Sequence, residues 1–180
     1  DIAYIAVIIS CFISSLRKHT SCTLAHSPAN TSPDPTIIDG GTVRLGAAGA
    51  LPSGTSVSLA NAAGVALDLD GYWQTIASLS GGGTSGGNVA LGSAQLTVGS
   101  GSFAGVISGV GGSLRKVGSG TLVLSGGNTY TGSAIIEGGT PRLGAAGAVP
   151  AGPGVSLAKG ARAGERRVGE GRRTRVRAEG

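Results

Sequence analysis

The sequence predicts an all-β protein, a parallel β-helix in which short strands stack as successive coils. Three observations predict this fold. Glycine supplies 35 of the 180 residues, and glycine weakens a helix interior by about 1 kcal/mol per residue. The hydrophobic residues, 40% of the chain, are mostly Ala, Val, Leu and Ile. They stand in short runs that alternate apolar and polar positions, which is typical of half-buried strands. Finally, a long segment of the chain occurs twice.

The repeated segment is most evident at residues 37–60, which begin IIDGGTVRLGAAGALPSG, and at residues 135–158, which begin IIEGGTPRLGAAGAVPAG. Of these 24 positions, 18 are identical at an offset of 98 residues. The same offset holds upstream, where SLRK occurs at 15–18 and again at 113–116. Repetition of this kind is the sequence signature of a solenoid, in which each unit completes its core by stacking on its neighbours.

Short alternating runs mark the expected strands, and Gly, Ser or Asn stands between them. In chain order they are TVRL (42–45), VSLA (57–60), VALDL (65–69), TIASL (75–79), NVAL (88–91), QLTV (95–98), GVIS (105–108), TLVL (121–124) and AIIE (134–137). At about 3.3 Å per residue, a coil with three short faces needs roughly 20 residues. The 98-residue repeat would then hold about four to five coils. A flat antiparallel sandwich is the alternative, but it needs more hairpin signals and larger core side chains.

The chain divides into three segments. Residues 1–36 are a glycine-depleted copy of residues 99–134, because the later stretch has 11 glycines and the earlier one none. If several of those glycines have positive φ, each replacement costs roughly 1–2 kcal/mol, so we expect a degenerate copy that folds less well. Its apolar run IAVIISCFI (5–13) aligns with a strand and turn of the later copy, so we interpret it as a strand and not as a targeting segment. Residues 37–158 are the β-helical repeat region, and residues 159–180 are a basic tail.

The net charge of +5 gives little support to nucleic-acid binding. Seven of the 14 basic residues lie after residue 160, and the chain up to that point has seven basic and six acidic residues. A basic face with interleaved aromatic residues is missing from this body of the sequence. The tail at 159–180 could bind nucleic acid or anionic lipid. We favour a disordered or out-of-frame end, because the tail has few aliphatic residues and no alternation.

Residues 111–144, GGSLRKVGSGTLVLSGGNTYTGSAIIEGGTPRLG, resemble the autotransporter-associated β-strand repeat, also called the passenger-associated transport repeat. The resemblance is good over residues 37–158 and weak over 1–36. Pro141 departs from the pattern, which has an aliphatic strand residue there. The motif residues that carry the resemblance, for which we expect a structural role, are Leu114, Lys116, Gly118, Gly120, Thr121, Leu122, Leu124, Ser125, Gly126, Asn128, Thr129, Tyr130, Thr131, Gly132, Gly139, Thr140, Leu143 and Gly144.

The resemblance implies a right-handed β-helical stalk in the passenger of a type V secreted protein, at the bacterial cell surface or outer membrane or in the secreted fraction. The implied role is to aid vectorial folding and export. The implied partners are a C-terminal β-barrel translocator, which we expect outside this stretch of sequence, and neighbouring passenger repeats. An adhesin surface for host or neighbouring-cell ligands is the alternative function. A polysaccharide-degrading enzyme on a β-helix is a third and less favoured one.

Metal sites have little support in the sequence, and we expect no catalytic residue, metal or cofactor. Cys11, His19, Cys22 and His26 lie close together in the sequence, but their spacing matches no common zinc site. A Cys11–Cys22 disulfide is equally unsupported.

The carboxylates of LDLDG (67–71) are a second candidate site. Asp68 and Asp70 point to the same strand face and could hold Ca²⁺ or serve a lyase. Because Leu67 and Leu69 alternate inward, we favour two solvated carboxylates.

Three further features have a structural interpretation that we prefer to a functional one. The run SGGGTSGGN (80–88) suggests a phosphate loop, but it lacks the G-K-[ST] ending and predicts a turn. Tyr72 and Trp73 are the only adjacent aromatic pair, and we favour a core or cap position over a sugar-binding platform. Asn128 is expected to stack with Asn residues of neighbouring coils, as amide ladders do.

Overall fold

The computed structural model describes residues 22–24, 35–150, 154–157 and 177–178. Within these residues the regular elements are all β-strands. They are β1 (Cys22–Leu24), β2 (Thr36–Ile38), β3 (Thr42–Leu45), β4 (Ser56–Leu59), β5 (Ala66–Asp68), β6 (Gln74–Gly81), β7 (Asn88–Ala90), β8 (Gln95–Phe103), β9 (Ile107–Ser108), β10 (Ser113–Lys116), β11 (Thr121–Leu124), β12 (Ala134–Ile136), β13 (Thr140–Leu143), β14 (Val155–Leu157) and β15 (Arg177–Ala178). No helix in this described part is long and apolar enough to cross a membrane.

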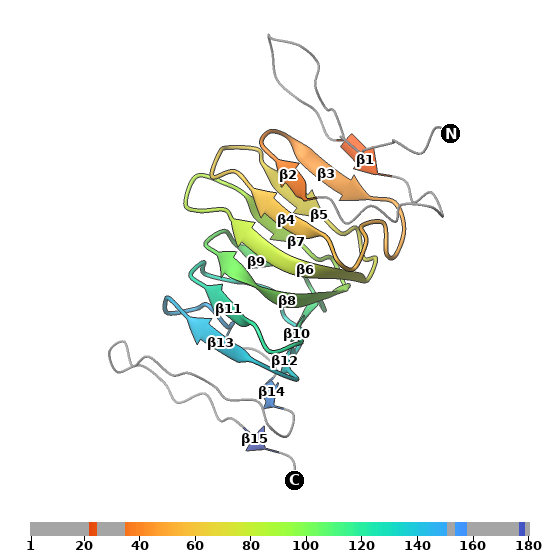
Figure 1. The fold of residues 1–180 in the computed structure, drawn as a ribbon. Coiled ribbons are helices and arrows are strands. Elements are labelled where there is room, and N and C mark those ends of the chain that lie inside the picture. Colours follow the sequence, from red (N-terminus) through yellow and green to blue (C-terminus); the bar gives the residue numbers. More distant parts are fainter. Residues whose placement is uncertain (1–21, 25–34, 151–153, 158–176, 179–180) are drawn as a thin grey trace.

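The strands pair in parallel and stack as about six coils of a β-solenoid (Figure 1). Strand register gives the length of each coil. Gln74 pairs with Leu96, and Leu96 pairs in turn with Leu114, so one coil separates each of these residues from the next. The prediction of a parallel β-helix with coils of roughly 20 residues is therefore confirmed. The antiparallel sandwich is wrong, because the chain crosses over between paired strands.

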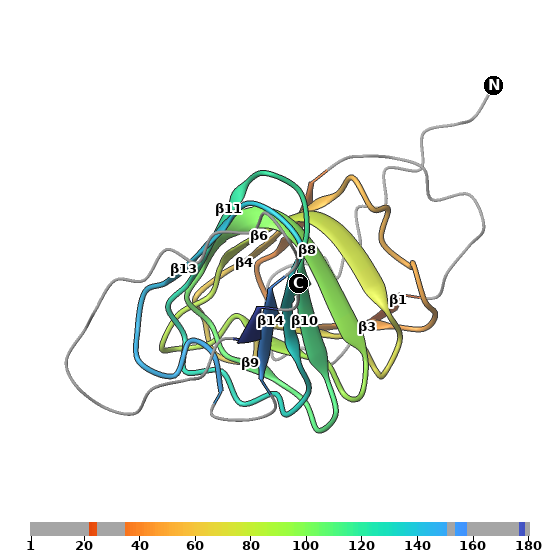
Figure 2. The same ribbon diagram turned by 90° about the horizontal axis from the view of Figure 1, so that it is seen from below.

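Each coil has three faces. Face A consists of β1, β3, β5, β7 and β9. Strands β6 and β8 are long, with eight and nine residues, and each turns a corner. Their first halves continue through β10, β12, β14 and β15, which together make face B. Their second halves join β2, β4, β11 and β13, which together make face C. In the end-on view of Figure 2 the coils overlie one another around a common interior.

Side chains that alternate inward fill this interior. On face A, Leu67, Val89 and Ile107 occupy the same position in successive coils, and each is fully buried. Complete burial of a Leu, Val or Ile side chain contributes about 1.5–3 kcal/mol. The stack repeats that contribution coil after coil, so the core is a column and not a single centre.

The 98-residue repeat does not contain a whole number of coils. Along face C, successive register partners lead from Thr36 through four coils to Leu122. The counterpart of Thr36 in the second copy is Ala134, on β12. From Leu122 the chain therefore still crosses face A and reaches face B before the second copy begins. The repeat is therefore four coils and two further faces long, within the predicted four to five. Its second copy consequently starts on a different face from the first.

Most of the two outer segments lies outside the described residues. This applies to residues 1–21, 25–34, 158–176 and 179–180. The expected degenerate copy at 1–36 and the expected basic tail at 159–180 therefore stay predictions.

Candidate functional site

The motif of residues 114–144 forms more than one coil toward the C-terminal end of the described solenoid (Figure 1). It starts on β10, passes along β11, crosses face A at residues 128–131 and ends with β12 and β13. The buried motif residues are Leu114, Lys116, Leu122, Leu124, Gly126, Asn128 and Tyr130. The partly or fully exposed ones are Gly118, Gly120, Thr121, Ser125, Thr129, Thr131, Gly132, Gly139, Thr140, Leu143 and Gly144.

Lys116 is a buried cation inside the solenoid, only 2% exposed. Its Nζ donates to the carbonyl oxygens of Val117 at 2.6 Å, Gly118 at 3.1 Å and Gly138 at 3.3 Å. Burial lowers the pKa of the Lys116 ammonium from its ordinary value of 10.5, because the charged form loses water. The ammonium thus holds the corners of two consecutive coils together.

Asn128 joins three consecutive coils through its side-chain amide. Its Oδ1 accepts a hydrogen bond from the backbone N–H of Ile107 at 2.8 Å. Its Nδ2 donates to the carbonyl oxygen of Ala148 at 2.6 Å. Asn128 is 6% exposed, so these bonds lie where water does not replace them. Among the described residues the amide bonds to backbone groups and not to another Asn, so the expected ladder of Asn side chains is wrong here, and a structural role of Asn128 stays a prediction.

Glycine is required in residues 99–134 for two separate reasons. Four of the 11 glycines in residues 99–134 have positive φ: Gly101, Gly109, Gly111 and Gly118. Gly126 does not, but a Cβ there would lie 2.0 Å from the carbonyl oxygen of Gly105. The hypothesis of positive φ is therefore confirmed for some of these glycines. At Gly126 the close approach of the preceding coil is the reason.

Tyr130 places a phenol in the interior. The residue is 1% exposed, and its hydroxyl has no hydrogen-bond partner among the described residues. Burial raises the pKa of Tyr130 to about 12, because the phenolate would have to leave water. The hydroxyl therefore stays protonated and is held at an energetic cost.

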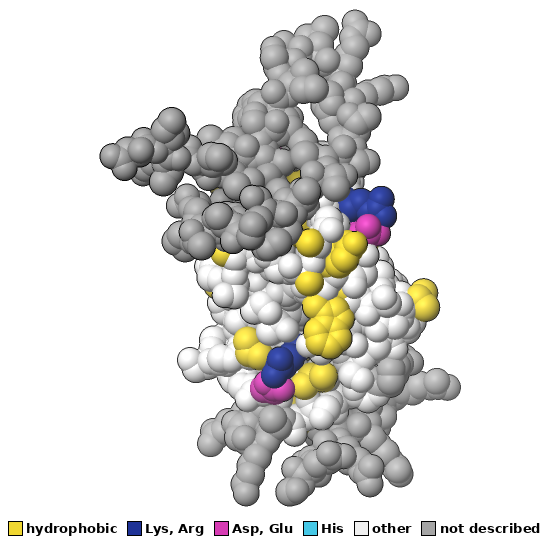
Figure 3. All heavy atoms as spheres, turned by 90° about the vertical axis from the view of Figure 1, so that its right-hand side faces the viewer, with side chains coloured by type: hydrophobic (Ala, Val, Ile, Leu, Met, Phe, Trp, Pro, Cys, Tyr) yellow, Lys and Arg dark blue, Asp and Glu magenta, His cyan; other side chains and the backbone are white. Residues whose placement is uncertain are grey.

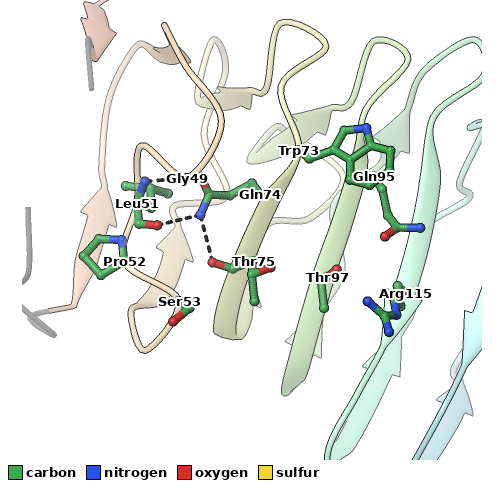
Figure 4. A pocket seen from close by; sticks show the side chains of 10 residues that line it. All are labelled: Gly49, Leu51, Pro52, Ser53, Trp73, Gln74, Thr75, Gln95, Thr97 and Arg115. Atoms are coloured by element: carbon green, nitrogen blue, oxygen red, sulfur yellow. Dashed lines mark hydrogen bonds between the residues drawn. The ribbon is translucent and has the colours of Figure 1, made fainter. Parts of the chain in front are cut away.

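A hollow of about 360 Å³ lies beside Trp73, on face B and the adjoining corner (Figure 4). Thr75, Thr97 and Arg115 stand in one row along it, because they are register partners on β6, β8 and β10. Trp73 is 65% exposed, so of the core or cap position that we favoured for Tyr72 and Trp73, the core is wrong for this side chain.

A buried glutamine holds one wall of this hollow in place. Gln74, 2% exposed, accepts a hydrogen bond from the N–H of Leu51 at 3.2 Å and donates to the Leu51 carbonyl at 2.7 Å. It also donates to the carbonyl of Thr75 at 2.8 Å. The loop of the preceding coil is thus fixed to β6. We did not predict this role for Gln74. The row beside it could have been predicted, because Thr75 and Thr97 are polar residues spaced at the coil length.

Comparison with known proteins identifies most of the motif of residues 114–144, which we call the motif coil. The family model of the passenger-associated-transport-repeat matches residues 114–140. The chain is also 47% identical over 131 residues to the adhesin BmaC autotransporter of Brucella suis biovar 1 (strain 1330). The chain carries an autotransporter passenger repeat. The alignment covers 69% of the chain and 4% of that relative, so the chain spans a small part of the relative's length. No solved structure matches the chain.

The residues that match the family model, 114–140, run from β10 to the first residue of β13. Leu143 and Gly144 lie beyond that match. The family and the relative place the chain at the cell surface or in the secreted fraction.

Asp68 and Asp70, the candidate calcium or lyase carboxylates, pair with an arginine of the preceding coil. Arg44 Nε lies 3.6 Å from Asp68 Oδ2, and an Arg44 Nη2–Asp70 Oδ1 hydrogen bond completes the pair. Asp68 also accepts from the Asp70 N–H at 2.9 Å. The hydrogen bond to Asp70 raises the pKa of the Arg44 guanidinium. Leu67 and Leu69 point inward and are fully buried, as predicted.

The other candidate sites have plain outcomes. In the part of the chain that the structure describes, no three His, Cys, Asp or Glu residues are grouped to hold a metal ion. Cys11, His19 and His26 lie outside that part, and only the backbone of Cys22 is described, in β1. The run at residues 80–88 includes the end of β6 and the start of β7, and between them the chain makes the predicted turn, with the N–H of Gly83 bonded to the Gly86 carbonyl at 2.9 Å.

Proposed function

We propose that this chain is a structural stalk segment of an autotransporter passenger, and that its motif coil aids vectorial folding during export. The observation that carries the proposal is that each coil bonds to the coil before it. The N–H of Ser125 donates to the Phe103 carbonyl, and the N–H of Thr129 donates to the Ile107 carbonyl, both at 2.9 Å. A coil can therefore form on a completed neighbour as soon as about 20 further residues are available.

The proposal assigns the chain two partners and no catalysis. One partner is a C-terminal β-barrel translocator, through which passengers of this family cross the outer membrane. The other is the set of neighbouring passenger repeats, which continue the stack on either side. A non-enzymatic role is supported by the relative, which is named an adhesin.

Surface display tests the stalk role. The chain would be placed between an export signal and a translocator barrel, and the displayed fraction measured by protease accessibility on intact cells. Leu122 is buried in β11 and Thr121 in the same strand is exposed. We expect Leu122→Asp to reduce display several-fold, because a buried carboxylate prevents the coil from closing. Thr121→Asp is the matched control and should leave display unchanged. Equal display of the Leu122→Asp variant would overturn the export role.

Adhesion is a second candidate function, favoured by one specific observation. Trp73 and Tyr72 form an exposed aromatic corner, at 65% and 39% exposure. Exposed Trp and Tyr are enriched at binding surfaces. In this candidate the stalk segment itself contacts a ligand of the host or of a neighbouring cell.

A further inference from the structure

We propose that the hollow beside Trp73 binds a neutral hexose unit of a glycan, with the sugar ring stacked on the indole. The proposal deepens the adhesion candidate and is independent of the stalk role. Its elements are the exposed indole, a row of hydrogen-bonding groups, a neutralised arginine and a fixed wall.

The indole is presented by a rigid corner. Asp70 has a φ of 49° and Gly71 a φ of 81°, so the chain turns sharply just before Trp73. The N–H of Tyr72 bonds to the Leu69 carbonyl at 2.8 Å, and the carbonyl of Trp73 accepts from the Gly49 N–H at 3.2 Å. The backbone on both sides of the ring is thus tied down while the side chain stays 65% exposed. A flat apolar ring held in this way suits the apolar face of a pyranose.

The row beside the indole supplies hydrogen bonds. Thr75, Thr97 and Arg115 come from adjacent parallel strands, which lie about 4.8 Å apart. Gln95 stands near Trp73 in the same hollow (Figure 4). The hydroxyl and amide groups of this row can both donate and accept, and the guanidinium donates. A ligand with several hydroxyl groups along one edge matches such a surface better than an apolar ligand does.

The charge of the hollow favours a neutral ligand. Arg115 Nη2 bonds to Glu137 Oε2 of the next coil at 2.6 Å. This bond raises the pKa of the guanidinium, which therefore keeps its charge, and the carboxylate cancels that charge locally. Figure 3 shows hydrophobic side chains between two places on this side of the molecule where basic and acidic side chains touch. An anionic ligand would have to displace Glu137, whereas a neutral hydroxyl can use the remaining guanidinium donors.

The hollow is also preorganised and of suitable size. Gln74 fixes the Leu51 loop to β6 through two hydrogen bonds, so little ordering is required on binding. The volume of the hollow, about 360 Å³, is at the lower end of the range for ligand pockets, which is about 300–1,000 Å³. One ring would fill it, and the rest of a longer glycan would remain in solvent.

Fluorescence titration tests the proposal directly, because Trp73 is the only tryptophan of the chain. The purified full chain would be titrated with unmodified oligosaccharides of glucose, galactose or mannose, and in parallel with oligosaccharides that contain uronic acid. We expect at least one neutral set to change the Trp73 emission in a saturable way, with weaker binding of the matching acidic set. An acidic set that binds more tightly, or no saturable change with any set up to millimolar concentration, would overturn the proposal.

Two variants test whether the indole itself contributes to binding. Their affinities for the same sugar would be measured by calorimetry. Trp73→Ala should weaken binding by about tenfold or more, as expected for a central aromatic contact. Ile37→Ala is the matched control, because Ile37 is also largely exposed, at 66%, but does not line the hollow, and it should change affinity less than about twofold. Circular dichroism checks that both variants fold. Equal affinities of the two variants would refute the site, whereas a failure of the stalk role would appear only in the display assay.

Discussion

The two copies of the repeated segment, compared over residues 36–50 and 134–148, have the same local structure in different places. Each copy is a strand, a glycine corner and a second strand. Gly41 and Gly139 both have a φ of 70° at the corner, and Gly49 and Gly147 have φ values of 67° and 81° after the second strand. Yet the first copy runs from face C to face A, and the second from face B to face C. The repeated segment therefore specifies the corner and not the face.

Burial differs more than backbone shape. Leu45 in β3 is fully buried, whereas its counterpart Leu143 in β13 is 42% exposed. Strand β3 pairs with β1 and β5, but β13 pairs with β11 alone among the described strands. Identical side chains thus contribute differently because the neighbouring coils differ. Stability in a solenoid belongs to the interface between coils as much as to the coil.

Each copy is also held by a different amide. Gln74, from the coil after the first copy, bonds both backbone groups of Leu51. Asn128, from the coil before the second copy, bonds the carbonyl of Ala148. The loop that contains LGAAGA is therefore bonded to a different side chain in each copy. It is stabilised by whichever polar side chain the adjacent coil places against it.

The largest effect is expected from exchanging Val43 and Pro141. This is the one position at which the second strands of the two copies, β3 and β13, differ. In a parallel ladder, alternate residues bond to opposite neighbours. The Ala66 N–H bonds to the Gly41 carbonyl at 3.1 Å, so Val43 also faces β5. In the second copy Thr140 bonds back to Gly120, so Pro141 faces away from β11. Proline at position 43 would remove a ladder donor, whereas at position 141 it removes none that β11 uses.

We therefore expect Val43→Pro to destabilise the chain by about 3 kcal/mol or more. Pro141→Val should change stability by less than about 1 kcal/mol. The measurement is the urea midpoint of the full chain, followed by far-ultraviolet circular dichroism. Similar shifts for both exchanges would contradict the difference in environment between β3 and β13.

Removal of the two amides is the next test. Asn128→Ala leaves the Ile107 N–H and the Ala148 carbonyl unpaired, and Gln74→Ala does the same to the two backbone groups of Leu51. Buried groups without partners cost about 1–3 kcal/mol each, so each variant should lose at least about 2 kcal/mol. Hydrogen exchange should show the loss in different regions: near residues 134–148 for Asn128→Ala and near residues 36–50 for Gln74→Ala.

The charged analogues serve as a further test of the two amides. Asn128→Asp and Gln74→Glu each keep an acceptor but bury a carboxylate against a backbone carbonyl oxygen, so at neutral pH each should lose at least as much stability as the alanine variant. If exchange rises equally throughout the chain for both alanine variants, the two loops are not independently clamped.

Much of this comparison could be predicted from the sequence, but not the change of face. The period-2 runs and the intervening glycines predicted the strands, because both signals are local. The face depends on the summed lengths of several coils, and these lengths are unequal: the step from Gln74 to Leu96 is longer than the step from Leu96 to Leu114. The exposure of Trp73 could not be predicted for a similar reason. It follows from the turn at Asp70 and Gly71, whereas the sequence favoured a core or cap position.

The smallest effect is expected from the phenol in the coil before the second copy. Tyr130 and Asn128 are buried in the same segment, but only Asn128 has hydrogen-bond partners among the described residues. Tyr130→Phe should therefore stabilise the chain by about 1 kcal/mol at neutral pH, because an unpaired buried hydroxyl is removed. A loss of stability on this change would mean that the hydroxyl is bonded after all, and that the motif tyrosine acts like the asparagine.

The pH dependence of Tyr130 gives a second measurement of the same contrast. Its pKa is raised from 10.0 to about 12 in the folded chain, so the unfolded chain releases this proton first. The part of the stability that depends on Tyr130 being protonated is fully present below pH 10 and is lost as the pH rises to about 12. Lys116 acts in the opposite sense, since its lowered pKa makes stability rise with pH only up to 10.5. Between pH 10.5 and about 12 the parent chain should therefore lose more stability than the Tyr130→Phe variant. Parallel alkaline unfolding curves would show that the phenol is solvated in the folded coil.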